Sequence, residues 1–217
     1  MNERITENLV RDQLRKFGYY SEENQIVVEE QKSQIKRVQT LLKTASKAGT
    51  GKGGYPEFII NWEVDPNFLI VIECKADTRY HESPSLDKVK DYAVDGVLHY
   101  AKALSKEFTV LAIAVSGTTA ESMKVSNFLY PCGGTEHKVL ANQDGLSINE
   151  IVSFNDYYKL ASYDPEVERK RHHDLIAFSK KLHELIWTAA KISEEEKPLL
   201  VSGTLLALMY KPFLQTF

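Results

Sequence analysis

Two apolar runs separated by a turn stand out in the pattern of hydrophobic and polar positions. The first is PEFIINW over residues 56–62, and the second is FLIVIECKA over residues 68–76. The intervening VDPN carries the Asp, Pro and Asn residues that are typical of a turn. The second run is apolar on both faces as far as Glu73, which indicates a strand buried within a sheet. Together the two runs predict a strand hairpin.

Helical spacing of apolar residues predicts a helix in residues 5–20 and another over about residues 85–106. Continuous apolar runs predict further strands in FTVLAIAVSG, residues 108–117, and KVSNFLY, residues 124–130. A hairpin, a crossover helix and another strand are the parts of an α/β sandwich. We therefore predict an α/β fold, with a mixed central sheet flanked by helices, over residues 1–160.

The pattern changes after residue 160. Residues 164–191 read as a long amphipathic helix, and residues 193–213 read as a second helix in which Ser193 and Glu196 form a capping box. We therefore predict a helical extension over residues 161–217. The residues on the apolar stripe of its first helix are Leu175, Phe178, Leu182, Leu185 and Ala189.

Composition limits the setting of the protein. No apolar run approaches the 18 residues that suggest a membrane span, and the start of the chain lacks the layout of a signal peptide, so we expect a cytoplasmic protein without a membrane partner. The net charge of −3 over 217 residues leaves DNA binding to a local patch or a partner domain. Residues 32–52 contain no acid, and we expect Lys43, Lys47 and Lys52 to meet phosphates.

Glu57, Glu73 and Lys75 form the constellation that carries chemistry. Glu73 and Lys75 are two positions apart on a strand, so they point to one face, and the hairpin brings Glu57 beside Glu73. Two carboxylates at one site repel each other, and a divalent cation relieves that repulsion. Mg²⁺ needs only one or two carboxylates, and Lys75 can stabilise charge that develops on a phosphate. The backbone carbonyl of Cys74 is a further candidate metal ligand, whereas its side chain reads as a small buried hydrophobe.

These residues resemble the PD-(D/E)xK nuclease motif. Pro56-Glu57 precedes Glu73-Cys74-Lys75 by 15 residues, and Glu57 replaces the usual aspartate. The surrounding GYPEFII and LIVIECKA resemble the nuclease domains of restriction enzymes, especially type I motor subunits and fused restriction–modification proteins. The resemblance covers roughly residues 1–160. It implies a restriction-type DNA endonuclease that uses Mg²⁺, or Mn²⁺ in its place, with Glu57 and Glu73 as metal ligands and Lys75 as the assisting residue.

Two further features of that family have partial counterparts here. A glutamate on the first helix often supports the site, and Glu7 is the matching candidate, although an acid near a helix N-terminus also suits the helix dipole. Related nucleases carry Gln-x-x-x-Tyr on the crossover helix. Tyr100 matches the tyrosine, but Gly96 stands in place of the glutamine. On the same helix, Asp95 and His99 read as a solvated face, with the DNA groove as the alternative.

The C-terminal segment from residue 189 to residue 213 resembles the helical segment that opens the methyltransferase part of type I and type IIG restriction–modification proteins. The chain has no methyltransferase catalytic motif and no cofactor-binding glycine loop. The resemblance implies methyltransferase and target-recognition domains in cis or trans, with double-stranded DNA as substrate. Because one site cuts one strand, we also expect a transient dimer on DNA.

Two alternatives remain open from the residues alone. The chain could use a nuclease fold as an inactive DNA-binding or assembly module, or it could cut branched DNA or RNA.

Two other motifs in the sequence do not support a prediction of function. The loop GTGKGG lacks the Ser or Thr and the preceding strand of a phosphate-binding loop. His172 and His173 are adjacent on the predicted helix, so they diverge and do not share one ion.

Overall fold

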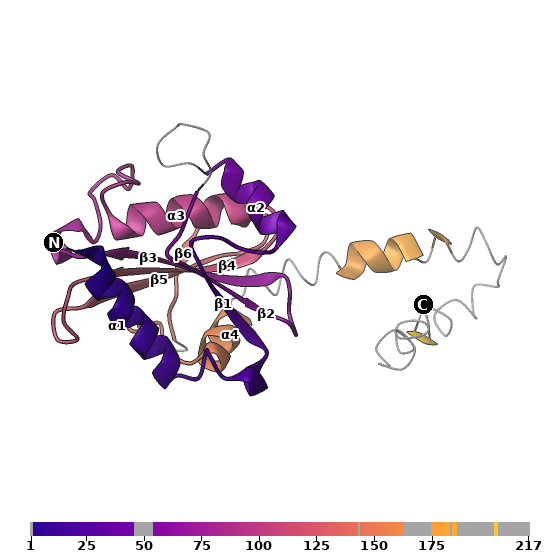
Figure 1. The fold of residues 1–217 in the computed structure, drawn as a ribbon. Coiled ribbons are helices and arrows are strands. Elements are labelled where there is room, and N and C mark those ends of the chain that lie inside the picture. Colours follow the sequence, from indigo (N-terminus) through magenta and orange to yellow (C-terminus); the bar gives the residue numbers. More distant parts are fainter. Residues whose placement is uncertain are drawn as a thin grey trace. The chain divides into compact units, whose positions relative to one another are not determined.

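The computed structural model describes residues 2–45, 54–142, 144–162, 175–182, 184–185 and 202–203. The chain divides into two compact units, Met1–Asp164 and Pro165–Phe217. The first unit consists of a central sheet with helices on both sides (Figure 1). It contains every residue of the predicted constellation.

The central sheet is mixed, and its strands follow one another in chain order. The two long central strands, β3 and β4, are parallel, whereas each other neighbouring pair is antiparallel. The predicted α/β fold with a mixed central sheet is therefore confirmed. The strands of the described residues are β1 (Ile26–Glu30), β2 (Phe58–Trp62), β3 (Phe68–Lys75), β4 (Thr109–Ser116), β5 (Lys124–Tyr130) and β6 (Lys138–Val139).

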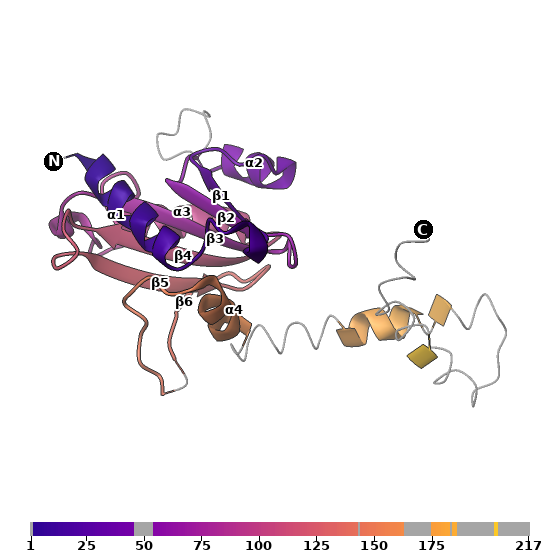
Figure 2. The same ribbon diagram turned by 60° about the horizontal axis from the view of Figure 1, so that its bottom comes forward.

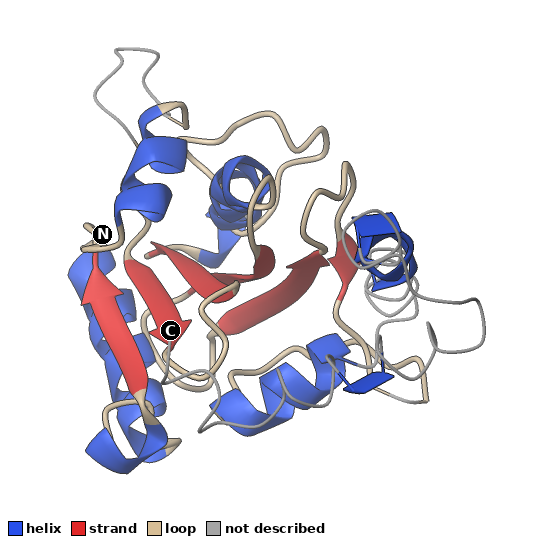
Figure 3. Ribbon diagram, turned by 90° about the vertical axis from the view of Figure 1, so that its right-hand side faces the viewer, coloured by secondary structure: helices blue, strands red, loops and turns tan. Residues whose placement is uncertain are grey.

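Helices cover both faces of the sheet. α2 and α3 lie on one face, and α1 and α4 lie on the other (Figures 2 and 3). α3 is the crossover that joins the parallel strands β3 and β4, as the sequence predicts. The α-helices are α1 (Glu3–Lys16), α2 (Lys36–Lys43), α3 (Ala93–Leu104) and α4 (Phe154–Ser162), with short 3₁₀ turns η1 (Glu22–Asn24) and η2 (Thr78–Tyr80).

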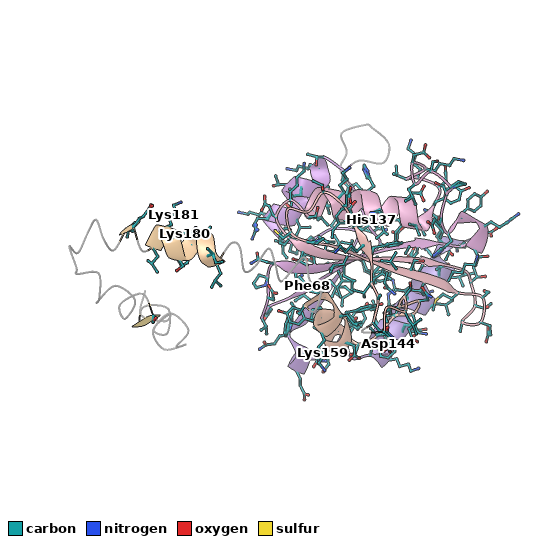
Figure 4. All side chains as sticks on the ribbon, turned by 180° about the vertical axis from the view of Figure 1, so that it is seen from behind. Phe68, His137, Asp144, Lys159, Lys180 and Lys181 are labelled. Carbon is teal, nitrogen blue, oxygen red and sulfur yellow. The ribbon has the colours of Figure 1, made fainter. Side chains whose placement is uncertain are left out.

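Alternate residues of β3 supply the two cores. Leu69 and Val71 join the cluster that α3 buries, which includes Val97. Phe68 points to the opposite face, where its ring lies 5.8 Å from that of Phe154 on α4 (Figure 4). This two-sided burial explains why β3 is apolar throughout, and it makes the charged pair at its end costly unless the charges are compensated.

The predicted start of the crossover helix is wrong. α3 begins at Ala93, not near residue 85, and the preceding segment from His81 to Tyr92 is a structured loop. Leu86, which fits the helical apolar stripe, is 39% exposed and has a φ of 54°. The reason is Asp95, which accepts hydrogen bonds from the backbone N–H groups of Ser83 and Lys88 and so holds the loop in its own conformation.

Among the described residues, two strands and two α-helices have no counterpart in the sequence prediction. β1 is an edge strand with a half-exposed pattern, and β6 has only two residues, so neither has a strong apolar signal. α2 lies within the basic stretch, where Val38 and Leu42 are its buried residues. α4 buries Phe154, Tyr157 and Ala161 at helical spacing.

The second unit is helical at residues 175–182, 184–185 and 202–203. Leu175, Phe178 and Leu185 of the predicted stripe are exposed there. Ala189, the predicted capping box at Ser193 and the adjacent histidines lie outside the described residues. No helix of the described segments has the length and apolar character needed to cross a membrane.

Candidate active site

The strand register places Glu57 opposite Glu73. Phe58 pairs with Ile72 across the antiparallel β2–β3 hairpin. Extending this register by one residue, away from the turn, sets Glu57 opposite Glu73. The backbone N–H of Gln31 donates to the carbonyl of Glu57 at 3.2 Å, which continues the ladder to the β1 side. Residues directly opposite in such a pair have Cβ atoms about 4.5–5.5 Å apart. The two carboxylates therefore meet on the face of the sheet that α3 covers.

Tyr100 of α3 fixes the approach to Glu57. A Cβ on Gly54 would lie 2.5 Å from the Tyr100 ring and 2.6 Å from the carbonyl oxygen of Ala45, so only glycine fits there. The Tyr100 hydroxyl also accepts a hydrogen bond from the backbone N–H of Tyr55 at 3.2 Å. The segment just before Glu57 is thus held between α2 and α3.

Lys75 bridges two acidic side chains. Its Nζ lies 3.4 Å from Glu73 Oε1 and 3.0 Å from Glu3 Oε1. Glu73 is only 1% exposed, and the Oε2 atoms of Glu57 and Glu73 are both inaccessible to solvent. Like charges directly opposite each other destabilise a strand pair, so this buried arrangement favours a cation close to both carboxylates.

The pKa shifts of three neighbours report the field of both carboxylates. Burial alone would lower the pKa of Lys75, but Glu73, Glu3 and Glu57 outweigh it and raise that pKa. Burial raises the pKa of Tyr100, and Glu73 and Glu57 raise it further. The Cys74 thiol is buried, and its pKa is raised by burial and then by Glu57 and Glu73. Lys75 is therefore a cation at neutral pH, and Cys74 is an inert thiol.

Thr6 anchors the start of α1 at the ends of β3 and β4. Its hydroxyl donates to the carbonyl of Gly117 at 2.8 Å and to that of Lys75 at 3.3 Å. This anchor brings Glu3, in the first helical turn, to the ammonium of Lys75.

Glu3 is the site residue that sequence reasoning missed. Glu7, the candidate on the first helix, lies one turn further along and is half-buried. The charge of Glu7 contributes to the raised pKa of Cys74, so Glu7 lies near the site. The ion pair with Lys75, however, is made by Glu3. Glu3 and Glu7 are four residues apart, so they lie on the same face of the helix. The position at which Thr6 anchors the helix decides that Glu3 is the one that reaches Lys75.

The donor set fits Mg²⁺. No group of three or more His, Cys, Asp or Glu side chains that could hold a metal ion occurs in the described segments. Mg²⁺ takes oxygen ligands and keeps several waters, so Glu57 and Glu73 suffice, with the Cys74 carbonyl as a candidate third oxygen. The neighbouring Lys75 carbonyl is already used by Thr6 and by the N–H of Gly117.

The other predicted residues fare differently. Lys43 is exposed at the end of α2, whereas Lys47 and Lys52 lie outside the described residues. Asp95 is not on a solvated face, because it is 1% exposed and bonded to the preceding loop. His99 is half-buried, so a fully solvated face is wrong for it as well.

Comparison with known proteins gives one informative match. The chain is 28% identical over 218 residues to the type II restriction enzyme and methyltransferase RM.BcgI of Heyndrickxia coagulans. The match covers 94% of this chain and 32% of that protein, so the chain spans about a third of the relative's length. No protein-family model matches the chain. No solved structure matches it either. The match supports a relationship between this chain and restriction–modification proteins.

Proposed function

We propose that the chain is the nuclease part of a restriction–modification protein and hydrolyses phosphodiester bonds of DNA with Mg²⁺. The observation that carries the proposal is the β2–β3 register, whose last pair, Phe58 and Ile72, sets Glu57 next to Glu73, with the Nζ of Lys75 3.4 Å from Glu73. The similarity to a restriction enzyme and methyltransferase supports the same reaction class. It also supports a methyltransferase as a partner.

Glu57 and Glu73 would hold the ion, which when bound neutralises a phosphate oxygen and lowers the pKa of a coordinated water. The ammonium of Lys75 lies beside Glu73 and can stabilise the negative charge that develops on the phosphate. Attack by water forms a new P–O bond, and the P–O bond to the leaving sugar oxygen breaks. The attacking water gives up one proton and the leaving oxygen takes up one, so that the protons balance. Glu3 keeps the ammonium in place throughout.

The test is nicking of supercoiled plasmid at low salt, with the protein in excess over DNA and with Mg²⁺ or Mn²⁺. The wild-type chain should convert supercoiled plasmid to the relaxed form only with the metal. Glu73→Ala and Lys75→Ala should abolish this conversion while the far-ultraviolet circular dichroism stays that of the wild type.

A matched control is Glu63→Gln, because Glu63 is an exposed acid at the opposite end of the same hairpin. It should nick at the wild-type rate. Full activity of both the Glu73 and the Lys75 variants would show that the site is wrongly assigned. A chain that binds DNA but never nicks it with either metal would point to an inactive DNA-binding module.

A further inference from the structure

A cleft of about 700 Å³ opens beside Lys75, at the segment that joins β3 to α3. Lys75 and Glu3 line it, and the connecting segment supplies the other lining residues. Its cationic and aromatic lining residues are Lys75, Arg79, Tyr80, Lys88, Lys90 and Tyr92, and the acids Glu3, Asp77 and Asp91 also line it. The volume lies within the usual range for sites that hold a small molecule, about 300–1,000 Å³.

The wall of this cleft is held in place by buried interactions. Asp95 accepts hydrogen bonds from the hydroxyl and the backbone N–H of Ser83, and from the N–H of Lys88 at 2.9 Å. The carbonyl of His81 accepts from the N–H of Val94 at 2.8 Å. The loop is thus pinned to the first turn of α3, and its lysines project from a fixed backbone.

The cleft is lined by four cations and three acids. Arg79 forms an ion pair with Asp77 at 2.6 Å, and Lys75 is engaged with Glu3 and Glu73. Lys88 and Lys90 are exposed on the wall, where Asp91 also lines the cleft and Asp87 is exposed next to Lys88 in the sequence. The lining therefore has one more cation than acid, and its two exposed lysines can meet phosphates.

Two tyrosines add a surface for a planar group. The ring centroids of Tyr80 and Tyr92 are 5.6 Å apart at an interplanar angle of 66°, and Tyr80 is 46% exposed. The Nζ of Lys88 lies 5.8 Å from the centroid of the Tyr92 ring. Exposed aromatic rings beside cations are the combination that binds single nucleic-acid strands, where bases stack and phosphates meet lysines.

We propose that this cleft binds one strand of nucleic acid, with phosphates against Lys88 and Lys90 and a base stacked on Tyr80. That the bound strand leads to the phosphodiester cut beside Lys75 rests on the proposed nuclease function, but the binding itself does not. Lys43, the last residue of α2, is not among the residues that line the cleft. It would hold the strand being cut on one side of the metal ligands.

The test is fluorescence anisotropy with a short labelled single-stranded oligonucleotide and with its duplex, both in EDTA so that no cleavage occurs. Lys88→Ala combined with Lys90→Ala should reduce the slope of log affinity against log salt by about 1.4, because each phosphate contact to a single strand contributes about 0.7. Tyr80→Ala should weaken single-strand binding about tenfold, whereas Tyr80→Phe should bind as the wild type does.

The matched control is Lys102→Ala combined with Lys106→Ala. Lys102 lies in the last turn of α3, about 13 Å along the helix axis from its start, Lys106 follows the end of the helix, and both are exposed. Unchanged binding and salt slope in the Lys88/Lys90 and Tyr80 variants would overturn the proposal. An effect on the duplex alone, without single-strand binding, would overturn it too. Because the assay contains no metal, a failed nicking assay with intact cleft effects would count against the nuclease function only.

Discussion

The candidate site depends on the positions of a few charged residues. Glu57 and Glu73 face each other across a strand pair, and Lys75 lies 3.4 Å from Glu73. The alternation of side chains along a strand and the position of the turn can both be read from the sequence, so the proximity of these three residues was predictable. Glu3 was not, because its contact to Lys75 depends on where the Thr6 hydroxyl ties α1 to the strand ends.

Removing one of the facing carboxylates should stabilise the metal-free protein. In EDTA, we expect Glu57→Gln to raise the free energy of unfolding by up to about 1 kcal/mol, because like charges directly opposite each other destabilise a strand pair. With Mg²⁺ the order should reverse, since an ion that binds only the folded wild type stabilises it. Urea denaturation of the wild type, Glu57→Gln and the control Glu63→Gln measures both effects. A Glu57→Gln protein that is less stable than the wild type in EDTA would contradict the carboxylate repulsion.

Glu3 and Glu7 can be separated by their effects on Lys75. Glu3→Gln should lower the nicking rate roughly 10- to 100-fold through misplacement of the ammonium, and Glu7→Gln should lower it less. Because Glu3 helps to raise the pKa of Lys75, its loss should also move the alkaline limb of the rate profile to lower pH. Equal pH profiles for the two variants would speak against a positioning role for Glu3. An unchanged rate in Glu7→Gln would assign Glu7 to the helix dipole.

At the scale of elements, the loop between β3 and α3 is tied to the sheet through His81. Its Nδ1 lies 2.8 Å from the Ser116 hydroxyl and its Nε2 lies 2.9 Å from that of Ser126. Burial, with the nearby charge of Lys124, lowers the pKa of His81 from 6.5 to about 4. His81 is therefore neutral in the folded protein over the pH range in which the unfolded chain protonates it.

This difference predicts a loss of stability in acid. Between pH 6.5 and pH 4 the unfolded chain binds a proton that the folded protein does not, so the free energy of unfolding falls as the pH is lowered. Between pH 7 and pH 4.5 the His81 share of that loss is roughly 2 kcal/mol. His81→Gln keeps a donor and an acceptor but does not titrate. Urea denaturation at pH 7 and pH 4.5 should show a smaller fall in the free energy of unfolding for this variant than for the wild type. Equal falls would show that His81 does not cause the loss of stability in acid.

The elements differ in how far the sequence reveals them. β2, β3, β4 and β5 are continuous or alternating apolar runs, and each falls where the pattern predicts it. The start of α3 does not, because Leu86 extends the stripe in the sequence while Asp95 captures the loop in the structure. β1 escapes prediction because an edge strand needs only half of its residues to be apolar.

At the scale of the whole molecule, the chain matches about a third of a restriction enzyme and methyltransferase. It has a net charge of −3 and no motif that reads bases. We therefore expect this chain alone to cut mixed-sequence plasmid weakly and without sequence preference, or not at all. Gel analysis of plasmid cleavage at low salt checks this. Discrete, reproducible fragments from the chain by itself would show that sequence recognition does not depend on other domains.

We expect Glu57 and Glu73 together to bind one divalent cation. Mn²⁺ binding measures it most directly, through the loss of the electron paramagnetic resonance signal of free Mn²⁺ on titration with protein, with Mg²⁺ as competitor. The wild type should bind one ion per chain, and both Glu57→Gln and Glu73→Gln should bind it at least about tenfold more weakly, a difference of about 1.4 kcal/mol. Glu63→Gln should bind as the wild type does. Equal Mn²⁺ affinity in the wild type and both site variants would show that Glu57 and Glu73 do not bind the ion.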